Sequence, residues 1–203
     1  DKYDVGFIEV LDENFGSRKD HTYAFADLMK KYDLLWVASG VRCTNVDEDD
    51  IIYYKESGCS SLKFGIESGS QKILDSMEKN FTVDNVVQAV TLCWKHGLYS
   101  PLAFMLGMPG EKNETVLETA AFIAQLAHGL GISPRLMDVG FFYALPFAGT
   151  PLYEYAQSIH LIGESAEEEE KYLEWLASTS TNKFSHLNVN SETFKNVMSW
   201  DFI

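Results

Sequence analysis

Short apolar runs and longer amphipathic stretches alternate along the chain. The apolar runs are rich in β-branched or aromatic residues and predict strands at 5–11, 34–39, 61–66, 101–106 and 136–144. The stretches between them carry apolar residues at helical spacing and predict helices at 21–32, 47–57, 71–77, 83–96 and 114–129. Five alternations of strand and helix are typical of a parallel sheet covered by helices.

Local signals fix several helix ends. Thr82 is an expected N-cap for the helix at 83–96, and Gly97 is its expected end. One apolar face of this helix is predicted to consist of Val86, Val87, Val90 and Trp94. Beyond the fifth strand, further helices are expected from Thr150, over 165–177 and over 192–200.

Two predicted strands end abruptly in glycine-containing loops. The run that starts at Leu102 stops at Gly107, Pro109 and Gly110, and the run from Leu62 stops in the same way at Gly69. Glycine lets backbone approach a bound group closely, and α/β folds place ligands at the carboxyl ends of strands. The sequence therefore predicts a site built from several strand ends.

Composition narrows the function classes. The chain has 203 residues, of which 46% are hydrophobic, enough for the core of one domain. It carries 16 basic and 30 acidic residues, a net charge of −14, which argues against a nucleic-acid partner unless a region outside this sequence supplies basic surface. No apolar run approaches the roughly 20 residues that span a bilayer, and no signal peptide is recognisable. We therefore expect a soluble, cytoplasmic protein.

Three cysteines and the first residues complete this picture. Cys43, Cys59 and Cys93 are odd in number and widely spaced, so they indicate neither a metal site nor a disulfide framework. The chain enters its first apolar run within four residues of Asp1, without a cap or a turn. We expect it to be a piece of a longer polypeptide.

Several strand-end motifs follow one another in a fixed order. They are Asp12-Glu-Asn-Phe15, Arg42, Gly58-Cys59, Phe64-Gly-Ile-Glu-Ser-Gly-Ser70, Met77-x-Lys79 with Thr82, Gly97, Met105-x-Gly-x-Pro-Gly-Glu111 and Pro146-x-x-Gly-Thr-Pro-Leu-Tyr153. As an ordered set they resemble the radical S-adenosylmethionine (SAM) superfamily. The nearest resemblance is to its branch with a cobalamin-binding domain, which includes anaerobic Mg-protoporphyrin monomethyl ester cyclase-like Fe-S oxidoreductases.

The resemblance implies a fold. It is an α/β fold, a partial (β/α)6 TIM-like barrel with parallel strands that lacks the first βα unit and carries a helical C-terminal tail. The barrel is expected to cover 1–160 and the helical extension 161–203.

One family motif is absent from the chain. The superfamily's Cys-x3-Cys-x2-Cys, which binds a [4Fe-4S] cluster, belongs after the first strand of the family's barrel, and no such spacing occurs here. Cys43, Cys59 and Cys93 fall on separate elements and do not replace it. We expect the motif upstream of Asp1, in preference to a degenerate homologue without a cluster, and we expect this chain alone to be inactive.

The resemblance also assigns roles to residues at the first strand ends. Asp12 and Asn14 would receive the ammonium group of SAM, and the alternative is an Asx turn that closes the strand. Glu67 and Ser68 would reach the ribose hydroxyls or the amino-acid part of SAM. Arg42 would bind the SAM carboxylate or, alternatively, pair with Glu67.

The later strand ends carry the remaining predicted contacts. Gly107, Pro109 and Gly110 would shape a loop beside the adenine, with Leu106 and Met108 in apolar contact with the base. Glu111 is expected to cap the following helix. The residues that could face substrate are Tyr143, Pro146 and Thr150. Thr150 is also a good helix start. The histidines are expected to be structural or solvated; they are His21, His96, His128, His160 and His186. Tyr23 and Trp36 are expected to be packing residues.

The activity that the resemblance implies is that of a radical SAM enzyme. A reduced [4Fe-4S] cluster cleaves SAM to a 5′-deoxyadenosyl radical, and methyl transfer, with cobalamin bound by a domain outside this chain, or oxidative cyclisation follows. The expected partners are a hydrophobic small-molecule substrate and an electron donor such as flavodoxin or ferredoxin. Two alternatives are a cluster-free barrel scaffold or binding module, and a tRNA methylthiotransferase, against which the net charge argues.

Overall fold

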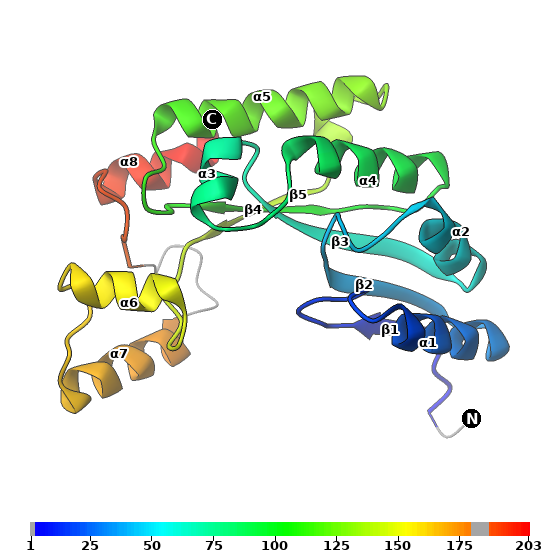
Figure 1. Ribbon diagram of the computed structural model, residues 1–203, viewed down its shortest axis with the longest axis horizontal. Coiled ribbons are helices and arrows are strands. Elements are labelled where there is room, and N and C mark those ends of the chain that lie inside the picture. Colours follow the sequence, from blue (N-terminus) through cyan, green and yellow to red (C-terminus); the bar gives the residue numbers. More distant parts are fainter. Residues whose placement is uncertain (1–2, 180–186) are drawn as a thin grey trace. The chain divides into compact units, whose positions relative to one another are not determined.

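The computed structural model describes residues 3–179 and 187–203, and five strands form its sheet (Figure 1). The strands are β1 (Phe7–Val10), β2 (Leu35–Val41), β3 (Cys59–Glu67), β4 (Leu102–Leu106) and β5 (Val139–Tyr143). They lie in the order β1-β2-β3-β4-β5, and the pairs from β1 to β4 are parallel. The chain therefore has the predicted α/β fold, with neighbours in sequence also neighbours in the sheet.

Helices connect the strands and continue after β5. Those between strands are α1 (Lys19–Lys31), α2 (Glu48–Glu56), α3 (Gln71–Ser76), α4 (Val83–Lys95), α5 (Asn113–Gly129) and the short 3-10 helix η1 (Pro134–Leu136). Those after β5 are α6 (Pro151–Ser158), α7 (Ala166–Thr179), α8 (Phe194–Ser199) and the 3-10 helix η2 (Trp200–Phe202). This order confirms the partial TIM-like barrel with a helical tail. The domain boundary at 160/161 stays a prediction.

The fifth strand begins later than the sequence pattern predicts. Leu136 was expected to open the fifth strand, but it ends η1, and β5 begins at Val139. Pro134 occupies the first turn of η1, where its fixed φ and missing N–H are compatible with a helical turn. The proline, five residues ahead of Val139, delays the start of the strand.

The described chain divides into two compact units. The first contains the described residues up to Phe104 together with Glu118–Gly140, and the second contains Met105–Leu117 together with Phe141–Ile203. The first holds the strand ends of β1, β2 and β3, and the second holds the loop that follows β4.

The core of the first unit is built on β2 and β3. Trp36 is completely buried and its ring contacts those of Phe15, Phe25 and Tyr54, which confirms it as a packing residue. Its indole N–H donates to the carbonyl of Ser57 at 3.1 Å. Large aromatic side chains bury much apolar area, so this cluster fixes how α1 and α2 pack on the sheet.

Helix α4 confirms its predicted cap but not all of its predicted face. The Thr82 hydroxyl accepts from the Asn85 N–H, and the Asn85 side chain accepts in return from the Thr82 N–H, a capping box. Val86 and Val90 are buried as predicted, together with Ala89 and Cys93. Val87 and Trp94 are instead exposed by 38% and 44%, because the face that meets the sheet is narrower than the run of apolar residues.

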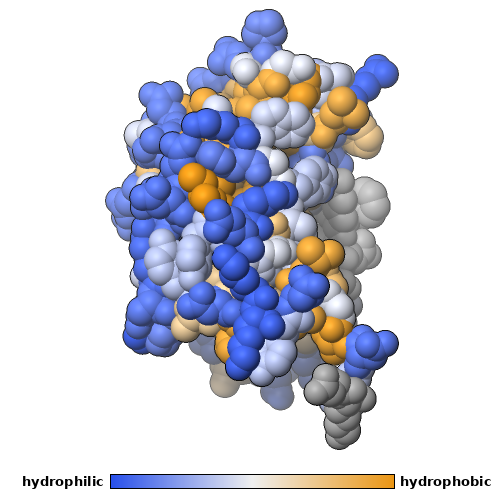
Figure 2. Space-filling view, turned by 90° about the vertical axis from the view of Figure 1, so that its right-hand side faces the viewer, coloured by the Kyte–Doolittle hydropathy of each residue, from blue (hydrophilic) through white to orange (hydrophobic). Residues whose placement is uncertain are grey.

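The surface shown in Figure 2 is mainly hydrophilic, and its apolar side chains appear as small separate groups. Such scattered apolar groups are ordinary on a folded protein. Within the described part of the chain, every helix is too short or too polar to span a membrane.

Candidate functional site

The clearest polar feature of the first unit lies at the carboxyl end of β3. Glu67, the last residue of the strand, has φ = 69°, a left-handed backbone conformation that L residues other than glycine rarely adopt. Its Oε1 lies 2.8 Å from the Nζ of Lys79, which follows α3. Both side chains are mostly shielded from solvent, with 18% and 29% exposed, so this ion pair is only partly screened by water.

Arg42 lies at the same end of the sheet, just after β2. Its guanidinium donates to the backbone carbonyl of Lys79 at 2.5 Å. The suggestion that Arg42 pairs with Glu67 is therefore wrong for this structure, because Lys79 takes that place. We call Arg42, Glu67 and Lys79 the strand-end charge cluster. Lys79 received no role in the sequence analysis, although its motif, Met77-x-Lys79, was part of the resemblance.

The turn after Glu67 is held by helix α5. The hydroxyls of Ser68 and Thr119 share a hydrogen bond of 3.3 Å, and the Gly69 N–H donates to the Thr119 hydroxyl at 3.0 Å. Ser70 donates to the carboxylate of Glu118. Ser68 is 1% exposed, so its hydroxyl serves the fold, and its contact with SAM stays a prediction.

Only glycine fits at position 69. A Cβ there would lie 2.7 Å from the Cβ of Phe122 and 2.8 Å from the Cα of Thr119, both too close for real atoms. Gly69 therefore lets the turn approach α5 closely enough for the Thr119 hydrogen bonds to form. Through this turn, α5 holds the backbone beside Glu67.

The loop after β1 forms a local turn. The Asp12 carboxylate accepts from the Asn14 N–H at 3.0 Å, so the Asx turn considered from sequence is present. The side-chain Oδ1 of Asn14 accepts in turn from the side-chain Nδ2 of Asn45 at 2.8 Å, which ties this loop to the segment between β2 and α2. Asp12 and Asn14 remain exposed, and their role toward the SAM ammonium stays a prediction.

In the second unit, the carboxylate of Glu111 shapes the loop after β4. Its Oε2 accepts from the N–H groups of Gly107 at 2.7 Å and Met108 at 3.3 Å. Glu111 is 1% exposed, and burial raises the pKa of its carboxyl to about 7 despite these two hydrogen bonds, which act in the opposite direction. The two N–H groups that Glu111 binds belong to the loop ahead of α5, so its observed role is to close that loop.

The side chains of this loop differ in what they contact. Leu106 is 1% exposed and packs in a core cluster with Val116 and Trp200, whereas Met108 is half-buried against the cluster around Tyr153. Leu106 thus has its side chain in the core of its own unit. The adenine contacts of Leu106, Gly107, Met108 and Pro109 stay predictions.

Two candidate substrate residues have structural roles. Tyr143 is buried, and its hydroxyl donates to the Met198 carbonyl at 3.4 Å. The Thr150 hydroxyl accepts from the Tyr153 N–H, which confirms Thr150 as the N-cap of α6.

A [4Fe-4S] cluster does not fit the described residues. Cys43, Cys59 and Cys93 are all buried, and burial raises the pKa values of their thiols to about 11, 12 and 12. Iron binds the thiolate, which such surroundings disfavour. Across residues 3–179 and 187–203, no three His, Cys, Asp or Glu side chains are grouped to hold a metal ion, and His186 lies outside these residues.

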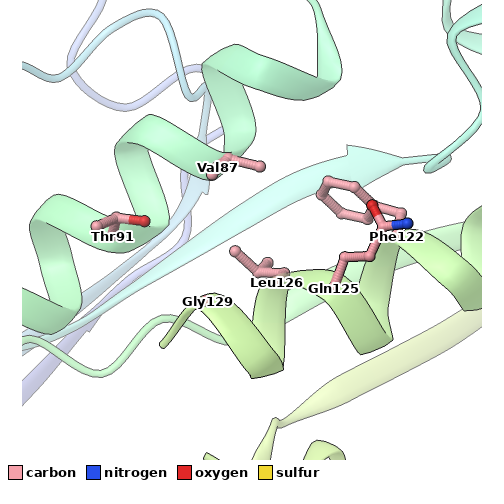
Figure 3. A pocket seen from close by; sticks show the side chains of 6 residues that line it. All are labelled: Val87, Thr91, Phe122, Gln125, Leu126 and Gly129. Carbon is pink, nitrogen blue, oxygen red and sulfur yellow. The ribbon is translucent and has the colours of Figure 1, made fainter. Parts of the chain in front are cut away.

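A hollow of about 410 Å³ lies between α4 and α5 (Figure 3). Val87 and Thr91 line it from α4, and Phe122, Gln125, Leu126 and Gly129 line it from α5. These residues bring no charge to the hollow. Its lining includes none of the residues of the strand-end charge cluster.

Two curated proteins are similar to this chain in sequence. An uncharacterized methyltransferase of Pyrococcus horikoshii is 32% identical over 163 residues, which cover 79% of this chain and 34% of that protein. The anaerobic magnesium-protoporphyrin IX monomethyl ester cyclase of Rubrivivax gelatinosus is 28% identical over 58% of this chain and 22% of its own length. The chain thus spans about a third or less of these relatives.

A solved structure shares the fold. The radical SAM methyltransferase TsrM of Kitasatospora setae, with cobalamin and a [4Fe-4S] cluster bound, superposes with a TM-score of 0.56. Its identity is 17%, over 70% of this chain and 28% of that one. The profile of the Radical SAM superfamily matches residues 2–123, more than half of the sequence and the part that holds the strand-end charge cluster. The chain therefore belongs to the radical SAM superfamily.

Proposed function

We propose that this chain supplies SAM-binding strand ends of a radical SAM enzyme, and that the full protein uses SAM for methyl transfer. The observation that carries the proposal is the strand-end charge cluster on a radical SAM fold. SAM offers an ammonium, a carboxylate and two ribose hydroxyls. A carboxylate at Glu67 and cations at Lys79 and Arg42 are the partners that these groups require.

The chain's own residues would bind and orient the cofactor. Glu67 would accept hydrogen bonds from the ribose hydroxyls, and Lys79 would hold the Glu67 carboxylate in place while it offers positive charge to the SAM carboxylate. The loop closed by Glu111 would lie beside the adenine. Asp12 and Asn14 would receive the ammonium. Since the cluster does not fit the described thiols, its ligands would be other cysteines, and this chain alone would be inactive.

Methyl transfer is favoured over oxidative cyclisation by the relatives. The Pyrococcus relative is named as a methyltransferase, and the TsrM structure is that of a methyltransferase with cobalamin bound. We therefore propose cobalamin as a cofactor of the full protein, held outside this chain. Oxidative cyclisation is the second candidate, since the Rubrivivax relative is named as a cyclase. We also propose that the full protein acts on a hydrophobic small-molecule substrate, receives electrons from a flavodoxin or ferredoxin, and is cytoplasmic.

The test uses the full natural polypeptide, reconstituted without oxygen, reduced with dithionite and incubated with SAM. We expect SAM to bind and 5′-deoxyadenosine to form, and cobalamin-dependent S-adenosylhomocysteine would distinguish methyl transfer from cyclisation. The matched variant is Glu67→Gln, which keeps the size of the side chain and removes its charge. Absence of both SAM binding and products would overturn the proposal and favour the cluster-free scaffold.

A further inference from the structure

The C-terminal segment of the second unit is hydrogen-bonded to the loop after β4. Asn190 is 7% exposed, and its Nδ2 donates to two carbonyls of this loop, that of Met108 at 2.5 Å and that of Glu111 at 3.0 Å. An amide nitrogen has two protons, so both are used. The two carbonyls lie three residues apart and are held by one side chain, which fixes the curvature of the loop.

Asn190 is itself held rigidly. Its Oδ1 accepts from the Glu192 N–H at 2.8 Å, and its own N–H donates to the Asn188 side chain at 3.2 Å. Asn188 also donates to the Glu192 carbonyl at 2.8 Å. The side chain of Asn190 thus has every polar atom satisfied, and a buried, fully satisfied polar network specifies one arrangement.

Other contacts join the same segment to the same loop. The Trp200 indole N–H donates at 2.6 Å to the side chain of Asn113, the first residue of the helix that follows the loop. A Cβ at Gly107, whose φ is 85°, would lie 3.2 Å from Cγ1 of Val197, so Val197 packs against the start of the loop. Residues 188–200 therefore contact the loop at Gly107, Met108 and Glu111, and α5 at its first residue, Asn113.

Two opposed sets of hydrogen bonds define the loop. The Glu111 carboxylate accepts hydrogen bonds from the N–H groups of Gly107 and Met108. The Asn190 amide donates hydrogen bonds to the carbonyls of Met108 and Glu111. A backbone held through both its donors and its acceptors has little freedom to change its path. Such support keeps binding loops in a productive geometry before the ligand arrives.

We propose that Asn190 is a positioning residue for SAM: through its side-chain amide, segment 188–200 holds the Gly107–Glu111 loop in the conformation that binds the cofactor. This inference rests on the proposed function, since it takes the loop as part of the SAM site. It gives the C-terminal segment a role in binding that the sequence alone did not indicate.

The test compares Asn190→Ala and Asn190→Asp with the unchanged full natural polypeptide. The Asp variant keeps the size of the side chain but places a carboxylate oxygen, in place of Nδ2, against the two carbonyls. Without any ligand, we expect amide hydrogen exchange at Gly107 and Met108 to rise about tenfold in both variants. The dissociation constant for SAM, measured by equilibrium dialysis, should rise by about the same factor. The KM for SAM should rise while kcat stays constant.

The matched control is Asn85→Ala, which removes the capping amide of α4 in the first unit. It should lower the melting temperature to a similar degree without changing exchange in the loop or SAM affinity. Trp200→Phe, which keeps the ring and loses only the bond to Asn113, should weaken SAM binding less than Asn190→Ala. The inference is wrong if the natural protein binds SAM but both Asn190 variants match it in loop exchange or in SAM affinity. If the unchanged protein does not bind SAM, the proposed function itself fails.

Discussion

The Oε1 of Glu67 and the Nζ of Lys79 lie 2.8 Å apart at the carboxyl end of β3, with the Glu67 backbone in a left-handed conformation. Such a conformation costs roughly 1 kcal/mol or more for a residue with a Cβ. The fold therefore retains a glutamate with a strained backbone at a position where glycine would adopt the same φ without strain. Strain of this kind concentrates at functional positions, which motivates the first prediction.

Replacing Glu67 should separate stability from binding. We expect Glu67→Gly to be about 1 kcal/mol more stable than Glu67→Ala, because glycine adopts a positive φ without strain. Both variants should lose SAM affinity by about 10- to 100-fold, since each removes a charge-assisted hydrogen-bond acceptor. Urea unfolding and equilibrium dialysis with SAM measure the two effects. Equal stability of the two variants would contradict the strain at Glu67.

Glu111 should make stability depend on pH. Its pKa in the folded protein is raised to about 7 from an ordinary 4.5, so between these values the folded state keeps a proton that the unfolded state releases. The contribution of Glu111 to the free energy of unfolding is thus largest below pH 4.5 and falls as pH rises to 7. At about 1.4 kcal/mol per pKa unit, the loss is at most roughly 3 kcal/mol.

The variant Glu111→Gln isolates this effect. It does not titrate, so the difference in unfolding free energy between the natural protein and the variant should shift in favour of the variant as pH rises from 4.5 to 7. Urea unfolding in a series of buffers measures it. A difference that stays constant with pH would show that the Glu111 carboxyl titrates normally.

Gly69→Ala should destabilise the first unit by about 1 to 3 kcal/mol, because the added methyl group would overlap Phe122 and Thr119 of α5. The control is Gly129→Ala at the end of α5, where a Cβ meets nothing within 4 Å. That control should change stability by less than about 0.5 kcal/mol. Thermal unfolding compares the two, and equal effects would refute the close approach of the turn to α5.

The 203-residue chain by itself should not retain an iron-sulfur cluster after anaerobic reconstitution. Its three cysteines are buried and their thiols have raised pKa values, so thiolate ligands are disfavoured. Iron and sulfide analysis after desalting measures retention. Cys93→Ser serves as control and should give the same low iron content. Stoichiometric iron that this substitution abolishes would contradict our view of these thiols.

Much of the fold follows from local sequence. The alternation of strands and helices, the Thr82 cap and the Thr150 cap depend on residues within a few positions of one another, so periodicity and capping signals predict them. The ordered strand-end motifs likewise identified the superfamily that the profile confirms. These features can be predicted from the sequence because each depends on residues that are close together along the chain.

The contacts of the site were decided by tertiary structure. Glu67 pairs with Lys79, 12 positions away, instead of Arg42, and Asn190 reaches Met108 across 82 positions. No periodicity links such residues, because their proximity depends on how α3 and the C-terminal segment pack after the chain has folded. The sequence alone determined the order of elements and the family, whereas packing decided which charged and amide groups meet, since partner choice depends on distances that exist only in the folded chain.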